Sequence, residues 1–391
     1  MTTVQTPSLA PTNLWTAVFL ALAIAVVNGF GRFAYALILP AMREDLIWDY
    51  AASGWLNTAN SIGYALGGLS GMLLLIRYRS SRLFIVGLVA TVVCVAAVGL
   101  TRNLFWMLLW RFIAGIGSAW VFSCGGALVA ARYSSDPQKA GSAIAIFFAG
   151  GGLGIALSGL VVFPVLSGGM TWAAAWLTLG LVGAVLAVMP ILSVNQIEGP
   201  PAKLAKDPLP WHNYAWITFA YFLFGMGYII YMTFVIAWLK EMRLGVFVST
   251  SLWVVMGLAV MASGWVWQKP MARWKPSSTF AAASMCTALG SALPIVLRSE
   301  PALLVSVVMV GGSFFMVPAA MTALARKTLP QSLWAKAMNM FTMVFAVGQA
   351  FGPVLAGWIA DTAGMNQAML MGATVLVVSS AIGLTQFRKA S

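Results

Sequence analysis

Twelve long apolar segments are the feature of this sequence that most restricts its fold. Each is about 20 residues or longer, and a helix needs about 20 mainly apolar residues to cross the hydrocarbon core of a bilayer. The segments are residues 14–42, 51–76, 82–101, 104–131, 138–163, 170–193, 212–239, 246–268, 277–297, 301–325, 332–361 and 365–387. The short stretches between them leave no room for a water-soluble catalytic domain. The sequence therefore predicts an all-α polytopic membrane protein with twelve transmembrane helices.

The charged residues lie mainly in the loops between these segments and predict the topology. Only 8% of the 391 residues are charged, and the formal net charge is +13. With the N-terminus placed inside, 15 of the 22 lysines and arginines fall in inner loops. The outer loops hold Arg43, Arg102, Lys240, Arg243 and Arg298. Because cytoplasmic loops are enriched in lysine and arginine, both termini are predicted to be cytoplasmic. The basic charge then reports topology and does not indicate a nucleic-acid partner.

A long polar interruption and an internal repeat divide the chain into two halves. The interruption predicts six helices in residues 1–193, a cytoplasmic linker in 194–211 and six more helices in 212–391. Gly29-Phe-Gly-Arg-Phe-Ala-Tyr35 is similar to the stretch that starts 196 residues later, Gly225-Met-Gly-Tyr-Ile-Ile-Tyr231. Likewise, Gly150-x-x-x-Gly154 recurs 198 residues later as Gly348-x-x-x-Gly352-Pro353. Parallel repeats of six helices are typical of transporters whose site lies between the halves.

Three helix motifs carry a family resemblance. The fourth helix holds Arg111-Phe-Ile-Ala-Gly115, and the fifth holds glycines at 141, 150, 154 and 159, with Ile155 where an antiporter-type motif has proline. The first helix runs from Gly29-Phe-Gly-Arg to Leu39-Pro40. Over nearly its whole length the chain resembles the major facilitator superfamily, in particular the bacterial YbfB/YjiJ-type branch. The loop 71–82 has the basic residues of the family's signature but lacks its aspartate.

This resemblance implies two six-helix bundles, secondary transport by alternating access, a bacterial inner-membrane location and a monomer. It also implies that rocking of the bundles involves close glycine contacts between helices two and eleven and between helices five and eight. The glycine-rich fifth helix is typical of exporters and exchangers.

Two arginines lie deep within apolar segments. Arg32 is 11 residues from Arg43, and Arg111 is 9 residues from Arg102. At ~1.5 Å per residue these depths are roughly 16 and 13 Å, near the middle of the membrane. A guanidinium group presents a rigid fork of donors that suits a carboxylate or phosphate. We therefore predict Arg32 and Arg111 as substrate ligands, with one alternative for Arg111: it donates to backbone carbonyls and holds the helices together.

The carboxylates do not accompany these arginines into the membrane. The acidic residues fall in loops or at helix ends, and Asp361 comes closest to the membrane interior. Buried cations without counter-ions are unfavourable unless water or a bound anion compensates them. The charge pattern therefore favours a small organic anion as substrate. It also leaves two routes for coupling: the substrate carries its own proton, or one anion exchanges for another.

Other residues complete the predicted site. Asn28 and Tyr35 share a helical face with Arg32, and Tyr228 and Tyr231 occupy the matching stretch of helix seven. Further hydrogen-bonding candidates are Asn57 and Asn339. The residues predicted to act in gating or packing are Gly150, Gly154, Gly348, Gly352, Pro353 and Asp361. For each of the tyrosines and asparagines named above, the alternative is a role in interfacial belts or interhelical hydrogen bonds.

Other classes of function fit the sequence less well. An intramembrane enzyme needs a nucleophile with a base or a metal cluster, and intramembrane His, Asp and Glu are essentially missing. We expect no catalytic residue, no metal and no cofactor, and a small anionic molecule and the lipid bilayer as the only partners. A sensor would need an added signalling domain. The remaining alternative is a drug or metabolite efflux transporter with a broad, aromatic, largely neutral pocket.

Overall fold

A computed structural model describes residues 13–195, 197, 209–330 and 333–385. In these residues the chain forms helices and no strand. The helices of residues 13–195, the first bundle, are α1 (Trp15–Ile24), η1 (Ala25–Phe33), α2 (Tyr35–Leu46), α3 (Tyr50–Leu74), α4 (Ser80–Val98), α5 (Leu104–Arg132), α6 (Pro137–Ser167) and α7 (Trp172–Val194). Those of residues 209–385, the second bundle, are η2 (Trp211–Tyr214), α8 (Ala215–Glu241), α9 (Val246–Val266), α10 (Gln268–Arg273), α11 (Pro276–Leu297), α12 (Glu300–Ser313), α13 (Met316–Thr328), α14 (Trp334–Ala363) and α15 (Met365–Thr385).

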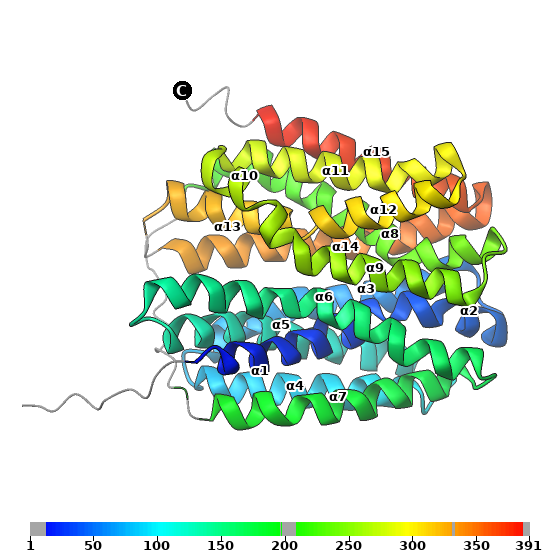
Figure 1. The fold of residues 1–391 in the computed structure, drawn as a ribbon, viewed down its shortest axis with the longest axis horizontal. Helices are drawn as coiled ribbons and strands as arrows, with labels where there is room; N and C mark the ends of the chain where they lie inside the picture. The colour runs from blue at the N-terminus through cyan, green and yellow to red at the C-terminus, as the bar shows by residue number, and fades with distance from the viewer. Residues whose placement is uncertain (1–12, 196, 198–208, 331–332, 386–391) are drawn as a thin grey trace, which may run out of the picture.

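The helices run back and forth along one common direction, which is horizontal in Figure 1. The first helix begins and α15 ends at the same end of the molecule, on the left of Figure 1, which we call the terminal end. The opposite end, the far end, carries the turns after α2, α4, α6, α8, α11 and α14. Most of the predicted linker 194–211 lies outside the described residues, as do the stretches 1–12 and 386–391.

The prediction of twelve membrane helices is confirmed. In the described part of the chain, eleven helices are long and apolar enough to cross a membrane, with α1, η1 and α2 forming one continuous span. The twelfth is α3, which has 25 residues. Five buried polar residues distinguish this helix, namely Ser53, Asn57, Thr58, Asn60 and Ser61. The least apolar of the long helices thus places its polar side chains inside the protein and not toward lipid.

Polar side chains cap the starts of several helices. The Asp49 carboxylate accepts a hydrogen bond from the amide of Ala52 (2.6 Å) at the start of α3. Asn103, Asp136 and Thr171 accept in the same way at the starts of α5, α6 and α7. Because the first amides of a helix lack partners within it, such caps typically stabilise a helix start by about 1 kcal/mol.

Glycines set the spacing of helices within each bundle. A Cβ atom on Gly150 or Gly154 of α6 would lie 2.2 Å from the backbone oxygen of Ala21 or Ala25. In the second bundle, a Cβ atom on Gly348 or Gly352 of α14 would lie 2.1 Å from the backbone oxygen of Phe222 or 2.5 Å from that of Met226. These predicted packing glycines therefore bring α6 against the first helix and α14 against α8, and both contacts lie inside a bundle.

The same contacts correct the predicted repeat of helices one and seven. Ala21 is equivalent to Phe222 and Ala25 to Met226, so the two helices correspond at an offset of 201 residues, not 196. The shared Gly-x-Gly letters are not equivalent positions. Gly29 packs on Gly154 of α6, whereas Gly225 packs on the backbone of Phe345, seven residues before the matching Gly352.

Other glycines bring the two bundles together. A Cβ on Gly54 of α3 would lie 2.4 Å from the oxygen of Pro353 in α14, and one on Gly357 would lie 2.4 Å from the oxygen of Tyr50. Between α6 and α9, a Cβ on Gly152 would lie 2.5 Å from the oxygen of Gly257. The close contacts between helices two and eleven and between five and eight are thus present, and they involve Pro353 but not the predicted glycines.

Candidate functional site

The first helix changes its geometry at mid-depth, where η1 is a π-helix of nine residues. The amide of Ala34 donates to the oxygen of Gly29 (2.7 Å), five residues back instead of four. Gly29 also packs directly on α6, since a Cβ at this position would lie 2.3 Å from the carbonyl carbon of Gly154. Widened turns of this kind often mark functional sites, because they redirect side chains and backbone carbonyls.

Arg111 uses the carbonyls of this widened turn. It is 1% exposed, and its Nη1 donates to the oxygen of Gly31 at 2.6 Å. Longer bonds of 3.4 Å run from Nη2 to the oxygen of Arg32 and from Nε to the oxygen of Leu56. The guanidinium also lies 5.4 Å from the ring centroid of Tyr35. In this structure Arg111 therefore connects α5 to η1 and α3 within the first bundle, as the alternative interpretation of this residue expects.

Arg32 points the other way, into the second bundle. It is 4% exposed, and its Nη2 donates to Oε1 of Gln349 on α14. The Nε2 of Gln349 in turn donates to the hydroxyl of Tyr228 on α8. The guanidinium lies 4.8 Å from the ring centroid of Tyr64 on α3. We call Arg32, Tyr64, Tyr228 and Gln349 the Arg32 cluster; it brings residues of four membrane helices together.

The charge of Arg32 is not neutralised within the described residues. Its Nε has no hydrogen-bond partner among them. The described carboxylates lie at helix ends or in loops, at Glu44, Asp45, Asp49, Asp136, Glu241, Glu300 and Asp361. An amide oxygen and a ring face attract a cation, but neither carries the full charge that offsets removal of a guanidinium from water. The cluster is therefore an electropositive site buried between the bundles.

Stacked aromatic rings extend from the cluster into the second bundle. The rings of Tyr228 and Phe345 are 5.5 Å apart and 7° from parallel, and Tyr221 stacks on Phe345 at 4.6 Å. Phe314 stacks on Tyr228 at 5.5 Å and meets Phe33 of the first bundle edge-on at 6.1 Å. All are buried. These rings, with Phe224, form what we call the aromatic wall, which begins at Tyr228 of the Arg32 cluster.

The structure brings only some of the predicted site residues to this cluster. Tyr228 joins Arg32 through Gln349, whereas the hydroxyl of Tyr35 donates to the oxygen of Ser53 at 2.7 Å. Tyr231 bonds Ser306 at 2.8 Å inside the second bundle.

The three predicted amides lie elsewhere. Asn57 donates to Thr233 across the bundle interface at 2.5 Å. Asn28 is buried within η1, and Asn339 lies ten residues from Gln349 along α14, about 15 Å closer to the terminal end.

Gln349 is the residue that the sequence analysis missed. It is 0% exposed and follows Gly348, which the glycine repeat had singled out. A depth count could have found it. Gln349 is 12 residues from Asp361, or roughly 18 Å, which is close to the depth of Arg32. A depth count does not give the helical face on which Gln349 lies, because α14 buries one face in its own bundle and another against the first bundle.

A second set of polar contacts joins the bundles at the far end. The Asp361 carboxylate of α14 accepts hydrogen bonds from the amides of Tyr50 and Ala51, both at 2.9 Å. The Tyr50 hydroxyl donates to Glu241 at 2.5 Å, and Lys240 pairs with Glu44 at 2.5 Å. Asp361 thus caps a helix of the other bundle. The cross-bundle polar contacts named here all lie between mid-depth and the far end.

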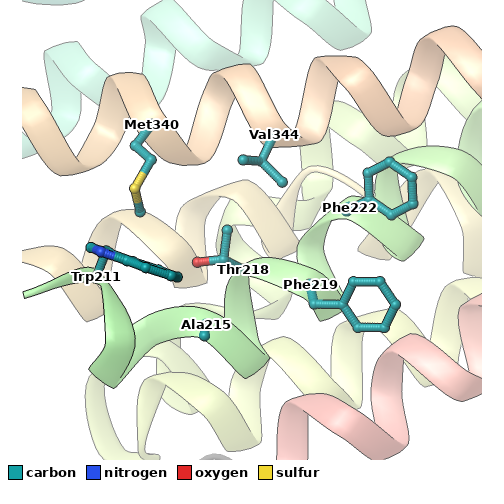
Figure 2. A pocket seen from close by; sticks show the side chains of 7 residues that line it. All are labelled: Trp211, Ala215, Thr218, Phe219, Phe222, Met340 and Val344. Atoms are coloured by element: carbon teal, nitrogen blue, oxygen red, sulfur yellow. The ribbon is translucent and has the colours of Figure 1, made fainter.

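A groove between α8 and α14 lies toward the terminal end (Figure 2). Met340 and Val344 of α14 project toward Thr218 of α8, with Trp211 and Phe219 to either side. Phe219 is 47% exposed and Trp211 is 55% exposed, so the groove opens on the surface of the bundle. Its lining is almost wholly apolar and includes no member of the Arg32 cluster: Trp211, Ala215, Thr218, Phe219, Phe222, Met340 and Val344.

Comparison with known proteins agrees with this arrangement. Residues 22–384 match the family described as "Uncharacterised MFS-type transporter YbfB". No curated protein matches the chain.

Among solved structures, a bacterial homolog of the human lysosomal transporter Spinster, in an inward-facing and unoccupied conformation, matches with a TM-score of 0.73 at 15% identity, covering 97% of this chain and 98% of that one. The nucleoside transporter NupG matches at 0.71 and 15%, covering 96% and 100%. The human organic anion transporter MFSD10 (TETRAN) matches at 0.69 and 14%, covering 94% and 98%. Identities this low establish the shared fold and nothing finer.

Proposed function

Because the chain belongs to the YbfB-type family of the major facilitator superfamily, we propose that it carries a small organic anion, of carboxylate type, across the membrane by alternating access. The family and fold are those of transporters, which bind a small-molecule substrate and span a lipid bilayer. The observation that carries the anion assignment is Arg32. Its charge is buried between the bundles, no described carboxylate accompanies it, and one donor nitrogen is free. A bound anion compensates such a charge.

The contacts between the bundles suggest how the cycle runs. The far end is held shut by Asp361, Glu241 and Lys240, and mid-depth is held by the Arg32–Gln349 contact. If the termini are cytoplasmic, as the charge distribution indicates, this conformation is closed toward the outside. We propose that the substrate reaches Arg32 from the cytoplasmic side. We propose an exporter or exchanger in a bacterial inner membrane, or a carrier that moves an acid with its own proton, acting as a monomer.

Ligand-induced thermal stabilisation tests the anion assignment. Purified protein is heated with organic acids, amines and neutral drugs, and the panel is repeated on Arg32→Ala. A ligand that prefers the folded protein raises its melting temperature by mass action. We expect only acids to raise it, and only in the wild type. Uptake by proteoliposomes then follows for the acids that bind. Equal shifts by amines or neutral drugs in both proteins would contradict the proposal.

The aromatic wall supports one second candidate, a broad-specificity efflux transporter for largely neutral compounds. Its parallel buried rings offer an apolar surface on which flat molecules stack. In that case Arg32 serves packing or gating. The same panel separates the two functions: neutral planar drugs would stabilise Arg32→Ala as strongly as the wild type, and substitution of Phe345 would weaken all of them together.

A further inference from the structure

Gln349 occupies the place where a substrate anion would meet Arg32. Its Oε1 accepts the hydrogen bond of Arg32, it is 0% exposed, and it belongs to the other bundle. Its position on α14 is fixed because Gly348, the preceding residue, packs directly on the backbone of Phe222. The amide group is therefore held against the guanidinium by a rigid part of the second bundle.

The amide is a poorer partner for Arg32 than a carboxylate. It offers one acceptor oxygen and no charge, and the Nε of Arg32 has no partner among the described residues. A carboxylate presents two acceptor oxygens in the geometry of the guanidinium fork, and hydrogen bonds between charged groups are about twice as strong as neutral ones. An anion that reaches this site therefore gains both the charge and the second hydrogen bond that Gln349 cannot supply.

We propose that Gln349 is an internal stand-in for the substrate, which the carboxylate of the substrate displaces from Arg32. This inference rests on the proposed function. In the empty transporter the Gln349 amide holds Arg32 and connects η1 to α14 and α8. When an anion replaces it, that connection between the bundles is released at the moment the site is filled. Gln349 then sets specificity, because only a group that binds Arg32 better than an amide enters.

The test uses two probes of similar size: a carboxylate, with a charge and two acceptor oxygens, and an amide, with no charge, one acceptor oxygen and an NH2 donor. Gln349→Ala leaves space beside Arg32, and its melting temperature is measured with acetate and with acetamide, which reproduces the amide of the missing side chain. We expect acetate to stabilise this variant with an apparent affinity about tenfold or more above that of acetamide. The double variant Arg32→Ala with Gln349→Ala should respond to neither. The inference is overturned if acetate and acetamide stabilise Gln349→Ala equally, or if neither probe stabilises it.

A second variant keeps the inference falsifiable if Gln349→Ala does not fold. Gln349→Glu builds the anion into the protein. It should have a higher melting temperature than the wild type and lose the response to substrate acids, because Arg32 is already paired. Gln367→Glu is the matched control, since it makes the same change at an exposed position of α15. An unchanged or lower melting temperature of Gln349→Glu, with acid binding retained, overturns the inference.

The proposed function and the stand-in role of Gln349 fail in different ways. If the wild type binds no acid through Arg32, the proposed function is wrong whatever the Gln349 variants do. If the wild type binds acids through Arg32 but Gln349→Ala does not prefer acetate to acetamide, the anion site stands and only the stand-in role of Gln349 is wrong.

Discussion

Arg32 and Arg111 are the same residue type at similar depth, yet their surroundings differ, and we propose opposite roles for them. Arg111 donates to carbonyls of its own bundle, at Gly31, Arg32 and Leu56. Arg32 reaches the other bundle, where a neutral amide is its acceptor and its Nε is unused within the described residues. Both contacts involve the π-helix: its carbonyls at Gly31 and Arg32 accept from Arg111, whereas the Arg32 side chain reaches Gln349. The backbone acceptors of Arg111 favour a structural role, and their absence at Arg32 is the reason why we propose Arg32 as the substrate site.

Replacing each arginine by methionine should have the largest effect at Arg111. Arg111→Met removes three hydrogen bonds from a charged donor to buried carbonyls, and a hydrogen bond to a charged group contributes about 1.5–3 kcal/mol. Partial compensation is expected in a membrane protein. We therefore expect a loss of roughly 3 kcal/mol or more, seen as a much lower melting temperature or as aggregation during size-exclusion chromatography. Arg111→Lys should recover only part of the loss, because an ammonium group cannot span the same acceptors.

Arg32→Met should show the reverse pattern. Removing an uncompensated buried charge in favour of an apolar side chain is often neutral or stabilising, so the melting temperature should stay equal or rise. Transport of the substrate acid should fall on the order of 100-fold, because losing a buried charged partner costs several kcal/mol of binding. Proteoliposome uptake and thermal shift measure the two effects separately. If Arg32→Met unfolds as readily as Arg111→Met, the distinction between the two arginines is wrong.

The difference between these arginines also shows how far sequence reasoning reaches. Twelve helices, the depth of both arginines and the position of Asp361 near a helix end follow from apolar length and residue counting. The π-helix does not, because glycines such as Gly29 and Gly31 also occur in ordinary helices. Gln349 is one amide in a 30-residue helix. Its role depends on the rotation of α14, which the sequence pattern leaves open when two faces of a helix are buried.

Mid-depth and the far end can be compared in the same way, because both hold the two bundles together. Asp361→Ala removes the acceptor for two amides at the start of α3, each bond typically worth about 1 kcal/mol. We expect the far end to open several-fold more often, with the Arg32 cluster unaffected. The opening is measured with a cysteine at position 58, since Thr58 faces Ala350 across the interface, in a protein whose Cys94, Cys124 and Cys286 are replaced. This cysteine should react several-fold faster with a thiol reagent in Asp361→Ala than in the protein that keeps Asp361. Glu300→Ala, at the exposed start of α12, is the control and should leave the rate unchanged.

The smallest effect is expected from Tyr228→Phe, which removes only the hydroxyl that accepts from Gln349. The ring keeps its place in the aromatic wall, stacked between Phe345 and Phe314. A single hydrogen bond to a neutral group is worth about 1 kcal/mol, so the melting temperature should fall slightly. If Gln349 competes with substrate, however, loosening it should strengthen acid binding, by up to about fivefold. Tyr221→Phe, in the same wall, should not strengthen binding. A loss of affinity in Tyr228→Phe would mean that the hydroxyl contacts the substrate directly. The substrate site would then include Tyr228 of the second bundle as well as Arg32 of the first.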